Sequence, residues 1–158
     1  MNKTSSILIA LLALAVAAAP AGAKTVAYKG KTKSGHSITF KRDGAKIKNV
    51  QSMVPTVCLT TSGGTDSTRT GGDIYKPPGA YELGKTTKRK GFQRTPFYPA
   101  KVTKNYTLTA KPGRNGKVTG KLDENFSFSL LGLDPWSGNS YIRIFICQGV
   151  TTFTAKPA

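Results

Sequence analysis

The residues best suited to chemistry are basic ones, gathered in the stretch KTTKRKGFQR at residues 85–94. Ammonium and guanidinium groups bind phosphates and carboxylates, and an aromatic ring among them can stack on a base or a sugar. This stretch therefore indicates a binding site for an anionic polymer, although a solvated loop without a ligand explains it equally well. Phe92 lies among its cations, which are Lys85, Lys88, Arg89, Lys90 and Arg94.

The whole chain has the same charge bias. Lys and Arg number 24 against 7 Asp and Glu in 158 residues, a formal net charge of +17. A field of this sign attracts polyanions over a long range, whether wall polymers, acidic polysaccharides, phospholipid surfaces or extracellular DNA.

Catalytic chemistry has little support in the sequence. His36 is the only histidine, and its spacing from Ile38 and Phe40 places it on the apolar side of a strand, which favours a structural role. A Ser-His-Asp site using Asp43 lacks the G-x-S-x-G elbow that would expose a nucleophile. We therefore expect that the protein is not an enzyme.

The acidic residues suggest neither a glycosidase pair nor a metal site. Asp123 and Glu124, in LDENF, are expected at a turn or an exposed strand end, with no opposed acid visible. Asp66 and Asp73 flank STRTGG, but the spacing of a calcium loop is absent. We expect no metal and no cofactor.

The first 23 residues, MNKTSSILIALLALAVAAAPAGA, have the pattern of a signal peptide. Lys3 precedes an apolar stretch, and Ala21-Gly22-Ala23 is an A-x-A cleavage site. We expect cleavage near Ala23 and a secreted, extracellular protein of one domain, residues 24–158. No later apolar run approaches the roughly 20 residues of a membrane-spanning helix, so we expect no transmembrane segment in the mature chain.

Two cysteines, Cys58 and Cys147, remain after the signal peptide. An even pair in an exported protein is typical of a disulfide, and we predict that they are bonded to each other. A reactive thiol is the weaker alternative.

The elements that carry these residues are predicted to be strands. HSITFKR alternates apolar and polar residues, and Gly35 and Gly44 provide turns, so residues 26–51 are predicted to form three antiparallel strands with lysines on the solvent side. Similar signals recur in KVTKNYTLTA, GRNGKVTG and NFSFSLL, and no window has a helical period.

We therefore predict an all-β fold, a single antiparallel two-sheet β-sandwich with one long irregular central loop. Residues 26–60 and 101–156 are expected to form the sandwich, and residues 61–100 an irregular basic insert. Within it, DIYKPPGAYEL is expected to add an edge strand or two turns, because Pro77 and Pro78 exclude a central strand. The predicted interior residues are Ile38, Phe40, Val54, Phe126, Phe128, Ile144 and Phe153.

The stretches YKGKTKSGHSITFKRDGAKIKNV, TVC, NGKVTGKLDENFSFSL and FICQGVTTFTAKPA carry a resemblance to a known kind of protein. The chain resembles uncharacterised small secreted bacterial β-sandwich proteins and repeat domains, over residues 26–60 and 102–156. These have no assigned activity, so the resemblance implies a β-sandwich and transfers no catalytic residue.

Together these observations predict a secreted, non-enzymatic binding module for anionic cell-surface or extracellular polymers, nucleic acid included, that acts as a monomer. The alternative is a structural or protein-interaction domain whose charge serves solubility only. An unrecognised hydrolase is the third candidate.

Overall fold

The computed structural model describes residues 24–62, 65–95, 98–133 and 136–158. The predicted signal peptide, residues 1–23, lies outside them. Strands dominate, and a short 3₁₀ turn, η1 (Arg114–Gly116), connects two of them. The strands are β1 (Val26–Thr32), β2 (Ser37–Asp43), β3 (Lys46–Ser62), β4 (Thr65–Tyr75), β5 (Ala80–Glu82), β6 (Thr86–Thr95), β7 (Tyr98–Pro112), β8 (Val118–Leu133) and β9 (Ser140–Pro157). The described residues include no helix long and apolar enough to cross a membrane.

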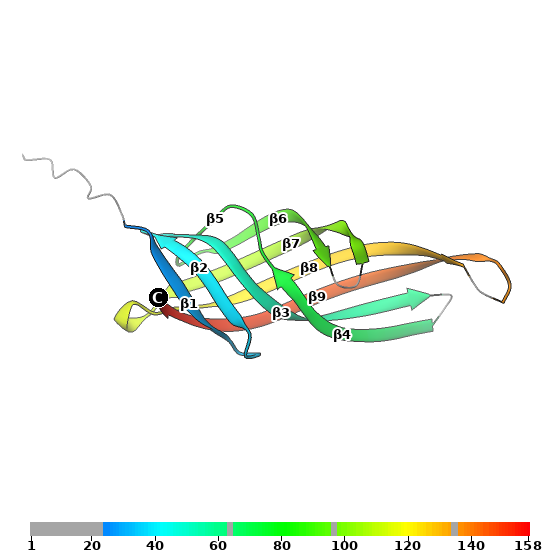
Figure 1. Ribbon diagram of the computed structural model, residues 1–158, viewed down its shortest axis with the longest axis horizontal. Coiled ribbons are helices and arrows are strands. Elements are labelled where there is room, and N and C mark those ends of the chain that lie inside the picture. Colours follow the sequence, from blue (N-terminus) through cyan, green and yellow to red (C-terminus); the bar gives the residue numbers. More distant parts are fainter. Residues whose placement is uncertain (1–23, 63–64, 96–97, 134–135) are drawn as a thin grey trace, which may run out of the picture.

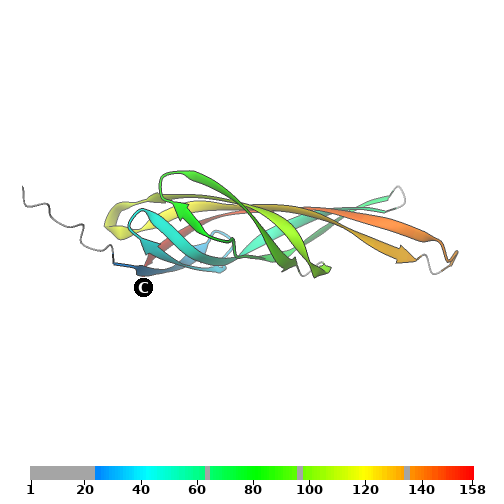
Figure 2. The same ribbon diagram turned by 90° about the horizontal axis from the view of Figure 1, so that it is seen from above.

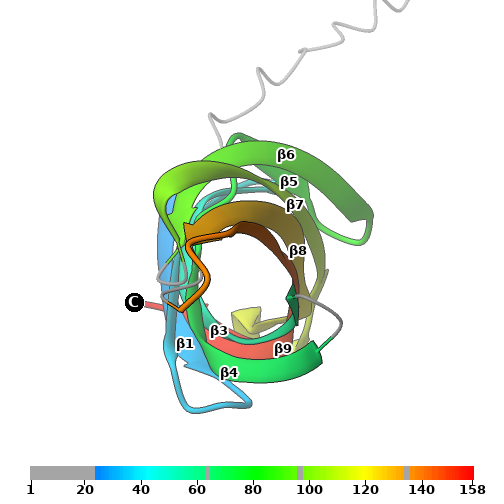
Figure 3. The ribbon, with the colours of Figure 1, turned by 90° about the vertical axis from the view of Figure 1, so that its right-hand side faces the viewer.

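All nine strands belong to one antiparallel sheet, so the fold is all-β as predicted, but its strands are not divided between two sheets. Hydrogen-bonded neighbours follow the order β4-β3-β2-β1-β9-β8-β7-β6, and β5 pairs with β3. The sheet rolls around an interior, as the end-on view shows (Figure 3). The alternation of apolar and polar residues in the sequence is the same for a sandwich and for a rolled sheet, because both folds place every second side chain inside.

The roll is held together by β3, which changes partners along its length. Its second half pairs with β9, from Thr56 opposite Gly149 to Ser62 opposite Arg143. Its first half pairs instead with β2, and the end of β9 pairs with β1. The β1–β2 hairpin therefore lies between β3 and β9 where the two long strands diverge (Figure 1).

The N-terminal hairpins have the predicted strands and turns. Gly35 and Gly44 have φ values of +84° and +57°, which only glycine adopts readily. Asn49 has a φ of 54° where the β2–β3 register shifts, and this bulge lets both Ile47 and Val50 face inward despite their odd spacing.

The interior contains most of the predicted core residues. Ile38, Phe40, Val54, Phe126 and Phe153 are buried, and Phe128 is partly buried. The prediction for Ile144 was wrong, since it is 46% exposed. Residues 144–146 are apolar on both faces of β9, and the inward positions are those of Phe145 and Cys147.

Residues 61–100 do not form the irregular insert that we predicted. They contain β4, β5, β6 and the first residues of β7. Pro77 and Pro78 lie between β4 and β5, outside any strand, as their missing amide protons require. This region is rich in threonine and glycine, so its strands lack the apolar alternation by which the others were identified.

The predicted disulfide is present. Cys58 and Cys147 face each other directly in the β3–β9 register, both are buried, and their sulfur atoms are bonded. The bond joins residues 89 positions apart in the chain, so it fixes β3 to the last strand.

Candidate functional site

The predicted polymer-binding cations lie mainly on β6, which is at one end of the strand order and pairs with β7. Because side chains alternate along a strand, the cluster is divided between two faces. Lys88, Lys90 and Arg94 are exposed on the outer face, together with Phe92, which is 77% exposed. Within the described residues these three cations form no ion pair.

The other two cations have partners of their own. Arg89 points the opposite way, donates to the carbonyl oxygen of Ala80 at 3.1 Å and lies 5.9 Å from the ring centre of Tyr81. Lys85 precedes β6 and pairs with Glu82 at 2.6 Å, which raises the pKa of the lysine and lowers that of the glutamate. The structure thus separates three cations on the outer face of β6 from Lys85 and Arg89, whose contacts with β5 stabilise the β5–β6 region.

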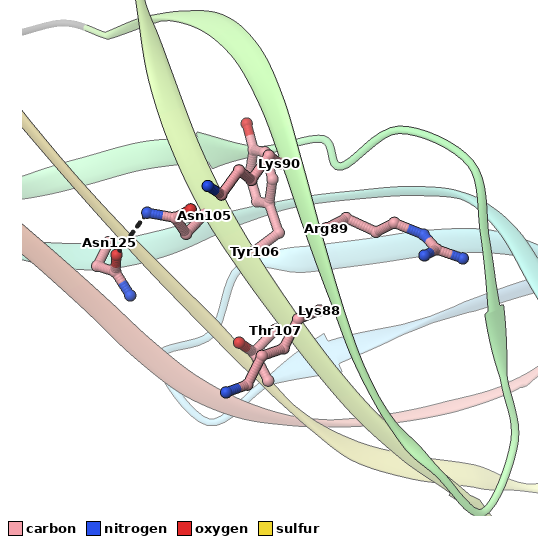
Figure 4. A pocket seen from close by; sticks show the side chains of 7 residues that line it. All are labelled: Lys88, Arg89, Lys90, Asn105, Tyr106, Thr107 and Asn125. Carbon is pink, nitrogen blue, oxygen red and sulfur yellow. Dashed lines mark hydrogen bonds between the residues drawn. The ribbon is translucent and has the colours of Figure 1, made fainter.

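A shallow hollow adjoins the outer cations. Its volume is about 450 Å³, and it is lined by Lys88, Arg89, Lys90, Asn105, Tyr106, Thr107 and Asn125. Figure 4 shows the amide of Asn105 donating to that of Asn125 across β7 and β8, at 3.0 Å, while Arg89 extends away from them. Cationic and amide groups together offer hydrogen bonds to phosphate, carboxylate or hydroxyl oxygens.

The acidic side chains offer little to balance this face. Each acidic side chain that the structure places lies within 4.0 Å of a lysine nitrogen: Asp43 of Lys48, Glu82 of Lys85, Asp123 of Lys121, and both Asp73 and Glu124 of Lys104. The remaining lysines and arginines therefore determine the sign of the surface potential.

Asp73 and Glu124 are the unexpected members of that set. Both carboxylates and Lys104 are 0% exposed inside the roll. Our prediction that Glu124 lies at a turn or an exposed strand end was wrong, because it occupies the middle of β8 between the buried Leu122 and Phe126. No group of three or more metal-ligating side chains suited to an ion occurs in the described part of the chain.

The alternation of inward and outward side chains along a strand was the signal that could have identified part of this buried cluster. Lys104 alternates in step with Val102, Tyr106 and Leu108, the apolar residues on one side of the predicted strand KVTKNYTLTA. Glu124 likewise lies on the same side of its strand as Phe126. A charged residue at an inward position indicates either a buried pair or a functional group.

Parts of β3, β4, β8 and β9 present an apolar outer face. Leu59 lies opposite Ile146, Met53 opposite Ile74, and Leu131 opposite Ile142, so the exposed side chains adjoin one another across strands. Their exposed fractions range from 42% for Met53 to 75% for Leu131. This face is far more apolar than the outer face of β6, which carries the three cations.

The chain matches no known family model, and no curated protein or solved structure is detectably similar to it.

Proposed function

We propose that the protein is an exported binding module for anionic polymers, and that it binds them through the outer face of β6. The observation that carries the proposal is the grouping of Lys88, Lys90 and Arg94 around the exposed Phe92, with no acidic side chain paired to them in the described residues.

The spacing on β6 suits an extended polymer. Alternate residues of a strand are about 7 Å apart, so Lys88 and Lys90 present two ammonium groups in line along the strand. Asn105 and Asn125 extend the polar surface across β7 and β8. Such a surface attracts phosphate or carboxylate groups by charge and offers hydrogen bonds without a deep cleft.

Two matched double variants test the proposal. Lys88→Gln with Lys90→Gln removes two outer cations, whereas Lys85→Gln with Arg89→Gln removes two that are already paired or packed. Binding to double-stranded DNA is measured as a function of salt. The outer variant should flatten the slope of log K against log salt by about 1.8, since each neutralised phosphate contributes about 0.9. The control variant should change the slope much less.

Two results would contradict the proposal. One is an equal effect of both double variants, which would mean that only overall charge matters. The other is the absence of salt-sensitive binding of the wild type to DNA, to teichoic-type polymers and to anionic vesicles at physiological ionic strength.

The apolar outer face favours the second candidate, a protein-interaction domain. Exposed apolar side chains that adjoin one another are typical of interaction surfaces, whereas isolated ones are ordinary. If this candidate is correct, Leu59→Lys should abolish the interaction while salt-dependent retention on polyanions stays weak and unspecific.

A further inference from the structure

The interior of the roll holds a lysine and two carboxyl groups that neither proposed function uses. Lys104 Nζ lies 2.5 Å from Asp73 Oδ2 and 4.0 Å from Glu124 Oε2. All three side chains are fully buried, and the ring centre of Phe126 is 4.7 Å from the same nitrogen. Burying such charges has a large desolvation cost, and an apolar replacement of similar volume is often at least as stable.

We propose that Lys104 and Asp73 condense into an intramolecular isopeptide bond, with Glu124 as the acid–base group. The reaction joins the side-chain amine to the side-chain carboxyl and releases water. It needs no oxidant, reductant or cofactor, and it does not rest on the proposed polymer binding.

The atoms and electrons balance as follows. A proton passes from the Lys104 ammonium to the Asp73 carboxylate, which leaves a neutral amine and a neutral acid in contact. The nitrogen lone pair attacks Cγ of Asp73 and forms a tetrahedral intermediate. Glu124 then donates its proton to the departing oxygen and accepts one from the nitrogen, so that water leaves and Glu124 ends in its starting form.

The surroundings of Glu124 suit this proton transfer. Burial, and to a smaller extent the charge of Asp73, raise the pKa of Glu124 to about 8, whereas Lys104 acts in the opposite direction. The carboxyl therefore holds a proton at neutral pH. Its Oε1 accepts from the hydroxyl of Thr56 at 3.4 Å, and its Oε2 has no hydrogen-bond partner among the described residues.

The surroundings of Asp73 suit the attack. The backbone N–H of Ile74 donates to Asp73 Oδ1 at 2.7 Å, so a donor already faces one oxygen on which negative charge develops in the intermediate. The other oxygen, Oδ2, contacts the amine. Fixed contact between two reactants replaces a bimolecular encounter and can remove a large share of the reaction barrier.

The bond would join strands that the sheet leaves apart. Asp73 is on β4, at one end of the strand order, and Lys104 is on β7, next to the other end. A hydrogen bond from Tyr75 Oη to the carbonyl oxygen of Thr107, at 2.9 Å, crosses the same gap. Together with Cys58–Cys147, a covalent bond here would fix the roll on both sides of its interior.

Mass spectrometry of folded, secreted wild type, reduced and then denatured, tests the proposal. The expected result is a chain lighter by one water than its sequence from the N-terminus found by peptide mapping. Tryptic digestion should also release a branched peptide that joins the segment containing Asp73 to the segment containing Lys104. Folded wild type with the full mass, and with separate tryptic peptides, would overturn the proposal without recourse to any variant.

Variants assign the roles of the residues. Lys104→Arg and Asp73→Ala should have the full mass, and Glu124→Gln should form the bond far more slowly. Asp73→Asn should still form it but release ammonia, so that the chain is lighter by one ammonia than its sequence. Lys48→Arg is the matched control, since Lys48 pairs with Asp43 at 2.8 Å on the surface, and it should leave the loss of water unchanged. Loss of water in Lys104→Arg would contradict the assignment.

Discussion

Thr56 and Glu124 are hydrogen bonded although their strands, β3 and β8, are separated by β9 in this part of the sheet. The residue between them is Gly149, which lies opposite both. A Cβ atom at this position would come within 2.8 Å of the Thr56 hydroxyl oxygen. The glycine therefore leaves the space through which the hydroxyl reaches the carboxyl group.

The buried Glu124 makes a testable contribution to the pH dependence of stability. Its pKa is raised from the ordinary 4.5 to about 8, so the folded state binds this proton more tightly than the unfolded state. Its contribution is fully present below pH 4.5 and is lost as pH rises toward 8, by up to about 1.4 kcal/mol per pH unit. Urea unfolding of wild type and Glu124→Gln across this window should show a steeper decline for wild type. Parallel pH profiles would contradict the assignment.

The disulfide should make a large contribution to stability. Closing a loop of about 90 residues stabilises a fold by roughly 4 to 5 kcal/mol in the chain-entropy model. The double variant Cys58→Ser, Cys147→Ser should lose stability of this order in urea unfolding. Reductant should lower the stability of wild type toward that of the variant and leave the variant unaffected. Two free thiols in the native protein would contradict the disulfide itself.

Two phenylalanines of β8 should differ in their contribution to the stability of the fold. Phe126 is 4% exposed and contacts the buried lysine, whereas Phe128 is only partly buried and stacks on Phe145 at a centroid distance of 4.6 Å. Phe126→Ala should therefore cost roughly 3 to 5 kcal/mol, the usual range for a core phenylalanine, and Phe128→Ala clearly less. Thermal unfolding of both variants checks this order. A larger loss for Phe128→Ala would show that the core lies elsewhere.

The two faces of β9 should tolerate substitution differently. Ile146 is 57% exposed and Phe145 is 3% exposed, although they are adjacent in the chain. Ile146→Thr should change the free energy of unfolding by about 0.5 kcal/mol or less, while Phe145→Thr should be strongly destabilising. Denaturant midpoints measure both. Equal losses would mean that the outer face is covered in the native protein.

Strands whose pattern is local were predictable from the sequence. Alternation around Ile38 and Phe40 located the first hairpins, and the predicted signal peptide together with two cysteines predicted the disulfide. Which side chains of β9 face inward was not predictable, because Ile144 and Phe145 are both apolar and only tertiary packing decides between them. The strands within residues 61–100 were missed because they are rich in threonine and glycine and lack apolar alternation, although β4 and β6 pair with their neighbours in the chain, β3 and β7.

The candidate sites were predicted to different extents. The five cations were identified from their density, but their separation into two faces depends on β6 being a strand and not a loop. In the buried cluster, alternation along the strands could have shown that Lys104 and Glu124 face inward. It could not have shown that Asp73 meets them, because no spacing in the sequence relates the three segments.

The pairing of β1 with β9 has a mechanical consequence. The amide of Ala158 donates to the carbonyl oxygen of Ala27 at 2.9 Å, so the described chain begins and ends on neighbouring antiparallel strands at the same end of the molecule (Figure 2). Tension applied between these two ends would peel β1 from β9 one hydrogen bond at a time, starting at the loaded end, instead of shearing all of them together. If the protein is attached to a partner through either end, that end of the molecule is the anchor, and the long β3–β4 and β8–β9 hairpins project away from it.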